Sequence, residues 1–223
     1  MGGDGIRVTN LSRNGTKLTS TEVNGRISGN FIENSGRYGV YVEDTGNAVT
    51  DWEVMDNWIA SSGVDGIHMD DAAGWVVERD HIYGVPHTAI YANRVFATSI
   101  SDNYIEDFGD TKTPGTWYGI DATVQGDAAS TLMGNRVFNF NGEATRGSTY
   151  RYIALSRVNY GSGVCGVTGN VVRGAGTPRG TGLYYATGGG RGVRLTVTST
   201  GNAVVNVHRQ EYAGPGVTLN RGL

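Results

Sequence analysis

The sequence is poor in cysteine and carries no excess of positive charge. Cys165 is the single cysteine, so an internal disulfide is excluded, and its apolar neighbours indicate a small buried side chain rather than a reactive thiol. The 18 basic and 21 acidic residues leave a formal net charge of −3. Because the sequence has no basic run to neutralise phosphates, we expect no nucleic-acid partner.

Long apolar runs are also missing. No stretch approaches the roughly 18 apolar residues of a membrane-spanning helix, so we expect no insertion into a membrane. The first residues, Met1–Gly5, contain no apolar core of a signal peptide. Two explanations stay open: the protein is not secreted by that route, or the natural chain begins upstream of Met1.

Glycine is abundant, at 36 residues, and it accompanies an internal repeat. Seven segments have the form apolar-x-(Gly/Asp)-Asn-x-apolar, of which Ile100-Ser-Asp-Asn103-Tyr-Ile105 is an example; Arg79 takes the third position once and Ser199 the first once. The fourth position is Asn six times and Asp once, and the sixth is always Ile or Val. The fourth-position residues are Asn30, Asn57, Asp80, Asn103, Asn135, Asn170 and Asn202.

A second series of segments lies between these repeats. In each of them a residue that is usually glycine precedes an aliphatic residue and opens a short alternating strand. The pairs are Gly5-Ile6, Gly39-Val40, Gly66-Ile67, Ala89-Ile90, Gly119-Ile120, Tyr152-Ile153 and Gly182-Leu183. Each repeat therefore contains at least two strands separated by turn residues.

The spacing of the repeats distinguishes between repeat folds. The Asn positions are 27, 23, 23, 32, 35 and 32 residues apart. A β-propeller blade needs roughly 40 residues or more, and helical solenoids need amphipathic 3.6-residue patterns that are absent. About 23 residues fits one turn of a parallel β-helix, and the longer repeats fit the same turn with a longer loop. The sequence therefore predicts an all-β fold, a right-handed parallel β-helix of about seven coils, forming one domain over residues 1–223 or a fragment of a longer chain.

The alternation of Asn-x-Ile corners with Gly-Ile strands resembles the pectate-lyase-like superfamily of right-handed β-helices. That superfamily includes polysaccharide lyases, polygalacturonase-type hydrolases, epimerases and phage tailspikes, so the resemblance implies a carbohydrate ligand. The catalytic motifs of the individual enzymes do not match. Asp65-Gly66-Ile67 and Asp70-Asp71 share one repeat, and no Gly-His-Gly, Arg-x-Pro-x-x-Arg or Asp-Pro-His element is present. No catalytic residue is therefore carried over from a known family.

The Gly-Ile strands predict a polar and aromatic panel on the outside of the fold. Where the aliphatic residues point inward, their neighbours point outward, and adjacent coils lie about 4.8 Å apart. We expect Tyr and Trp rings to contact sugar rings, and amide and guanidinium groups to bind the polar groups of a polysaccharide. The predicted substrate-binding residues are Tyr41, Tyr91, Asn93, Arg94, Trp117 and Tyr184. Long loops over 108–118, 141–151 and 174–181 are predicted to form a wall beside this panel.

The predicted catalytic residues are Glu43, His68, Asp70 and Asp121. Glu43 and Asp70 stand on neighbouring coils, where proximity raises the pKa of one acid and suits it to protonate a glycosidic oxygen. His68 is a candidate base for a lyase, with Arg94 neutralising a uronate. The alternative interpretation is a solvated face with no chemistry. No metal site is predicted, although Glu43, Asp44, Asp70 and Asp71 offer enough oxygens for Ca²⁺.

Two functions stay open. The first is an extracellular or virion-associated enzyme, a glycoside hydrolase or polysaccharide lyase that works along the exposed sheet without a cofactor. The second is a non-catalytic module that binds a cell-surface glycan, such as part of a phage tailspike, for which a homotrimer is an expected assembly.

Overall fold

The computed structural model describes residues 2–140 and 146–222, and in these ranges the chain folds into strands and turns without a helix. The strands form three long sheets, all parallel, and successive strands of the chain pass from one sheet to the next. This is the parallel β-helix that the sequence predicts, with the right-handed crossover that parallel connections adopt.

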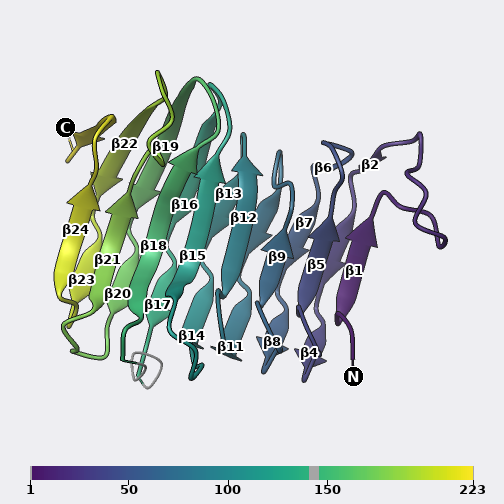
Figure 1. The fold of residues 1–223 in the computed structure, drawn as a ribbon, viewed down its shortest axis with the longest axis horizontal. Coiled ribbons are helices and arrows are strands. Elements are labelled where there is room, and N and C mark those ends of the chain that lie inside the picture. Colours follow the sequence, from purple (N-terminus) through teal and green to yellow (C-terminus); the bar gives the residue numbers. More distant parts are fainter. Residues whose placement is uncertain (1, 141–145, 223) are drawn as a thin grey trace.

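Sheet 1 contains the Gly-Ile strands and runs along the full length of the molecule (Figure 1). Figure 1 shows its members side by side, from the purple N-terminal end to the yellow C-terminal end. In order they are β1 (Ile6–Thr9), β5 (Val40–Glu43), β9 (Ile67–Met69), β12 (Ile90–Val95), β15 (Thr116–Val124), β18 (Thr149–Val158), β21 (Gly180–Tyr185) and β24 (Arg209–Ala213).

Sheets 2 and 3 contain the two halves of the Asn repeat. The strand before the Asn belongs to sheet 2, which consists of β3 (Arg26–Ser28), β7 (Glu53–Met55), β10 (Val76–Glu78), β13 (Ser99–Ser101), β16 (Ala129–Met133), β19 (Ser162–Thr168), β22 (Arg194–Thr200) and β25 (Val217–Asn220). The strand after it belongs to sheet 3, which consists of β4 (Phe31–Glu33), β8 (Trp58–Ala60), β11 (His81–Val85), β14 (Tyr104–Phe108), β17 (Arg136–Phe138), β20 (Val171–Arg173) and β23 (Ala203–Val205). A short pair, β2 (Glu22–Val23) and β6 (Val49–Thr50), lies apart from them.

The aliphatic residues of the repeats stack in register inside the helix. Ile32 pairs with Ile59, Ile59 with Ile82 and Ile82 with Ile105, and the last three are fully buried. Each buried Ile side chain contributes roughly 1.5–3 kcal/mol of transfer free energy. Because a coil can bury its apolar face only against the next coil, this register holds the whole stack together.

The Asn residues form a continuous hydrogen-bonded ladder at the corner between sheets 2 and 3. In one step of it, Asn135 donates from its backbone N to Asn170 Oδ1 (3.0 Å) and from Nδ2 to both Asn170 Oδ1 (3.0 Å) and the Ile100 carbonyl (2.9 Å). Asn135 Oδ1 in turn accepts from the backbone N and Nδ2 of Asn103. The residue before each corner is Gly or a non-Gly residue with positive φ, such as Asp102 (φ 56°), because the bend requires left-handed backbone.

Within the described ranges, no helix is long and apolar enough to span a lipid bilayer.

Replacing Asn135 by Ala will test the ladder. The change leaves the buried backbone N–H of Asn103 without an acceptor, removes one of the two acceptors of Asn103 Nδ2, and removes the donor to the Ile100 carbonyl, so we expect a loss of about 3 kcal/mol in the free energy of unfolding. Urea denaturation measures this value, and Arg136→Ala, at the exposed first residue of β17 directly after the corner, is the control. A loss below 0.5 kcal/mol, the usual size of a surface effect, would show that the ladder does not stabilise the stack.

Candidate functional site

The outer face of sheet 1 brings the predicted panel together. The register of the strands places one residue of each coil in a central row, which runs Arg7, Tyr41, His68, Tyr91, Asp121, Ala154, Tyr184 and Tyr212. A second row lies at the strand ends, where Asp70 and Asn93 follow Glu43. We call these two rows, with the residues that contact them, the sheet-1 panel.

Stacked rings form the centre of the sheet-1 panel. The His68 imidazole lies between Tyr38 and Tyr91, with ring centroids 4.3 and 4.6 Å away, and Tyr41 meets it edge-on at 5.6 Å. All four side chains are partly exposed. The rings pack along the helix axis, so they present edges and hydroxyl groups to solvent over three consecutive coils.

Two carboxylates hold His68. Its Nδ1 lies 2.7 Å from Asp65 Oδ2, and its Nε2 lies 3.5 Å from Asp70 Oδ1. Burial opposes protonation of the ring, but these two carboxylates outweigh it and raise the pKa of His68 above its ordinary value. The two carboxylates therefore stabilise the imidazolium form of His68 relative to a free histidine, and this form can act as a hydrogen-bond donor or an electrostatic group.

Glu43 and Asp70 do not behave as the predicted acid pair. Glu43 is ion-paired to Arg7 and accepts from Thr9 Oγ1 at 2.7 Å; although burial works against it, these donors lower the pKa of Glu43. Burial also opposes the ionisation of Asp70, but His68 and the Tyr41 hydroxyl (3.0 Å) lower the pKa of Asp70. The expectation that proximity raises one pKa is therefore wrong, because neighbouring donors outweigh the repulsion between the two acids.

Asp121 keeps its proton more readily than the other two predicted acids, Glu43 and Asp70. Its side chain is 7 % exposed, and its Oδ1 has no hydrogen-bond partner among the described residues. Burial raises the pKa of Asp121 to about 6, against the opposing effects of the Ser156 hydroxyl and Arg151. Two carboxyl groups on one face, Asp70 and Asp121, thus have pKa values shifted in opposite directions.

The predicted binding residues Asn93 and Arg94 are tied to neighbouring coils. Asn93 Nδ2 donates to the Asp70 carbonyl (3.0 Å), and its Oδ1 accepts from Thr123 Oγ1 (2.6 Å). Arg94, at the end of the same strand, ion-pairs with the buried Asp71 at 3.2 Å and is itself partly exposed. Arg94 is thus placed at the border of the panel, where part of its guanidinium stays open to solvent.

Of the two remaining predicted binding residues, Tyr184 lies in the panel and Trp117 does not. The Arg151 guanidinium lies 3.6 Å above the Tyr184 ring and donates to the Tyr118 hydroxyl at 2.9 Å, while Tyr212 stacks on the other side of Tyr184. Trp117 packs against the hydrophobic core and stacks on His87 at 4.5 Å. Of the predicted loop wall, residues 141–145 lie outside the described residues.

The four acids considered for Ca²⁺ are all engaged with donors of the protein. Both Asp44 oxygens accept from backbone N–H groups, those of Gly46, Ala48 and Val49, and Asp71 accepts from Ala73 N and Arg94. Glu43 and Asp70 have the partners given above. In the ranges that the structure covers, no three His, Cys, Asp or Glu side chains converge as a metal site would require.

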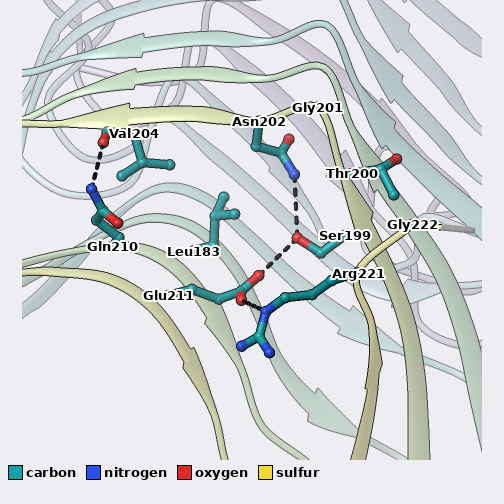
Figure 2. Close-up of a pocket in the computed structure, with 10 residues that line it drawn as sticks. All are labelled: Leu183, Ser199, Thr200, Gly201, Asn202, Val204, Gln210, Glu211, Arg221 and Gly222. Carbon is teal, nitrogen blue, oxygen red and sulfur yellow. Dashed lines mark hydrogen bonds and ion pairs between the residues drawn. The ribbon is translucent and has the colours of Figure 1, made fainter.

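A pocket of about 580 Å³ lies at the C-terminal end of the stack, away from the sheet-1 panel (Figure 2). Figure 2 shows Ser199 Oγ donating to Glu211 Oε1 (2.8 Å) and Arg221 Nε donating to Glu211 Oε2 (2.9 Å). Leu183 and Val204, which belong to the core or pack against it, line its apolar side. The pocket lies at the last coil of the stack, and its carboxylate, Glu211, is ion-paired to Arg221.

Sequence reasoning missed a third group of panel residues. Tyr38, Asp65 and Tyr118 each stand three positions before a central-row residue, directly ahead of the strand's opening Gly, and Arg151 has the same offset. Tyr38 stacks on His68, Asp65 holds its Nδ1, and Tyr118 contacts Arg151. The constant offset was readable from the repeat, although alternation alone does not place these residues on the outer face.

Comparison with known proteins gives one family. The profile of a family described as periplasmic copper-binding protein (NosD) matches residues 3–150, more than half of the chain. No curated protein and no solved structure matches the chain.

The protonation of His68 is open to direct measurement. We expect NMR titration to give His68 a pKa above its ordinary value, while burial lowers the pKa of His81, the internal control. Asp65→Asn removes a charged acceptor, so the His68 pKa will fall in this variant and that of His81 will stay the same. An unchanged His68 pKa in Asp65→Asn would contradict the described pairing.

Proposed function

This chain belongs to the NosD family, and we propose that it is a periplasmic β-helix that binds an extended polysaccharide along the sheet-1 panel. The periplasmic location comes from the description of the family. The ligand comes from the geometry of the panel and from the resemblance to pectate-lyase-like β-helices.

Copper, which the family description names, does not suit the described residues. Copper prefers imidazole and sulfur ligands. Both nitrogens of His68 face carboxylates, His81 stacks in sheet 3 against Trp58 and Tyr104, and His87 stacks on Trp117. Cys165 is 1 % exposed in the core. His208 is exposed in the turn before β24. Since the His and Cys side chains of the described ranges do not converge on one position, we base no function on the metal.

The observation that carries the proposal is the regular spacing of mixed groups on one open face. Rings, carboxylates, an amide and guanidinium groups follow one another on consecutive coils, about 4.8 Å apart. That spacing is close to the length of one sugar residue in an extended chain, so successive sugars meet successive coils. Aromatic groups supply apolar contact for the sugar rings, and Asp70, Asn93 and Arg94 bind hydroxyl groups or acidic substituents.

Cleavage is a second candidate, and one observation favours it. A glycosidase needs one protonated and one ionised carboxyl group. The opposite pKa shifts of Asp121 and Asp70 are in the direction that this need requires, and β12 separates β9 from β15, so the two strands lie about 10 Å apart. The 7 % exposure of Asp121 restricts access to it, which is why binding is the leading proposal.

Binding is tested with neutral and acidic polysaccharides in affinity electrophoresis, followed by calorimetry on the ligand that binds. Tyr91→Ala removes a central ring of the panel, and we expect affinity to fall about tenfold, the loss of roughly 1.4 kcal/mol. Tyr83→Ala is the matched control, because Tyr83 is 44 % exposed on sheet 3. Equal affinities of Tyr91→Ala and the unmodified protein, or an equal loss in Tyr83→Ala, would exclude the panel as the binding surface.

Cleavage is tested on the same ligands with a reducing-end assay and with absorbance of unsaturated uronates. If the protein cleaves, Asp121 must be protonated, so the rate will fall as the pH rises above about 6. Asp121→Asn and Asp70→Asn will each lower the rate at least 100-fold while binding persists. A rate that is unchanged in both variants would remove these acids from the mechanism, and no rate on a bound ligand would leave binding as the function.

A further inference from the structure

The one acid in the corner ladder differs from its neighbours in a way that involves a proton. At the four Asn positions inside the ladder, Asn57, Asn103, Asn135 and Asn170, Oδ1 accepts from the preceding coil, and Nδ2 donates both to the next Oδ1 and to a backbone carbonyl of the preceding coil. Asn103 follows this pattern, with Nδ2 donating to Asn135 Oδ1 (3.0 Å) and to the Val77 carbonyl (3.0 Å). Asn57 and Asn170 do the same.

Asp80 fits half of this pattern. Its Oδ1 accepts from Asn57 N (2.9 Å) and Asn57 Nδ2 (2.8 Å), and its backbone N donates to Asn103 Oδ1 (3.0 Å). Its Oδ2 stands where Asn carries Nδ2, is buried, and has no hydrogen-bond partner among the described residues. By the register of the ladder, the groups at this place are Asn103 Oδ1 and the Val54 carbonyl, which are both acceptors.

An ionised carboxylate at this position would have a negative oxygen directed at two acceptors. A carboxylic acid would instead have an O–H that donates to one of them, as the amide does on the other coils. We propose that Asp80 is protonated in the folded protein and that its proton closes the ladder, so that the stability of the β-helix falls when this proton is lost.

The charged groups around Asp80 do not compensate for a negative charge at Oδ2. Arg79, the adjacent residue, pairs with Asp56 of the preceding coil at 2.8 and 3.0 Å and also with Glu78, all on the outside of the corner. In the next coil, Asp102 stands at the position that Arg79 has in this one, and it is exposed. Above and below, Asn57 and Asn103 are neutral. Burial raises the pKa of Asp80 to about 7, with Asp56 adding to it and Asn57 and Arg79 opposing it.

The direction of the pH effect follows from linkage. An Asp in the unfolded chain has a pKa of about 3.9, below the value in the fold. The folded state therefore binds the proton more tightly, and the contribution of Asp80 to stability is full below pH 4 and is lost as the pH rises to about 7. Over this range the unfolding equilibrium constant rises by at most about tenfold per pH unit on account of this one group.

Three variants separate this role from that of the other acids. Asp80→Asn restores the amide of the ladder, so we expect a smaller loss of stability between pH 5 and pH 8 than in the unmodified protein, and a higher urea midpoint at pH 8. Asp102→Asn, at an exposed corner of the next coil, is the matched control and will keep the pH dependence of the unmodified protein. Asn135→Asp places a carboxyl at an equivalent step and will add a further loss between pH 5 and pH 8.

Infrared spectroscopy provides a readout that needs no reversible unfolding. At pH 5 the buried carboxylic acids Asp80 and Asp121 will both absorb in the unmodified protein, and the difference spectrum against Asp80→Asn will show the band that belongs to Asp80. The proposal is overturned if Asp80→Asn keeps the full pH dependence, or is less stable than the unmodified protein at pH 8, or leaves the carboxylic-acid band unchanged. If Asp80→Asn does not fold, the carboxylic-acid band is titrated in the unmodified protein alone. A band that disappears already below pH 5, or that persists up to pH 9, would then contradict the proposal.

Discussion

The register between coils is the constraint on which the rest of this structure depends. Each coil leaves an apolar face and the edges of its three strands unsatisfied, and the next coil covers the face and the edges at once. The fit is close: a Cβ on Gly39 would come within 2.3 Å of Ile59 Cγ2 and 2.7 Å of the Gly66 carbonyl. A slip of one residue would turn the aliphatic columns outward. Because the core fixes this register, it also fixes where every outward side chain stands.

Much of this arrangement could be predicted from the sequence, since the repeat itself records the register. The columns of Ile and Val, the corner ladder and the central row of the sheet-1 panel follow from counting residues between Asn and Gly-Ile positions. The partners of individual side chains could not be predicted in that way. The pairing of Glu43 with Arg7 depends on rotamers, and the raised pKa of Asp121 depends on how much water its neighbours exclude. Trp117 lies in a longer repeat, where counting gives no direction for its side chain.

Family and site give different kinds of information about this protein. The NosD profile covers the N-terminal two thirds of the chain and agrees with the fold, and its description names copper. The described His and Cys side chains are separated among the sheet-1 panel, two different aromatic stacks, the exposed turn before β24 and the core, which gives a metal no common position. A β-helix is a scaffold on which different sites are built, so the chemistry has to be argued from the outward rows. We propose that those rows bind a long, hydroxyl-rich ligand.

The most direct test is a crystal structure of the protein with the longest oligosaccharide that binds it. The account predicts sugar density that follows the helix axis across β5, β9 and β12, with sugars in contact with Tyr41, Tyr91 and the groups around His68. Density on sheet 2 or sheet 3, or confined to the pocket at the C-terminal end, would contradict it.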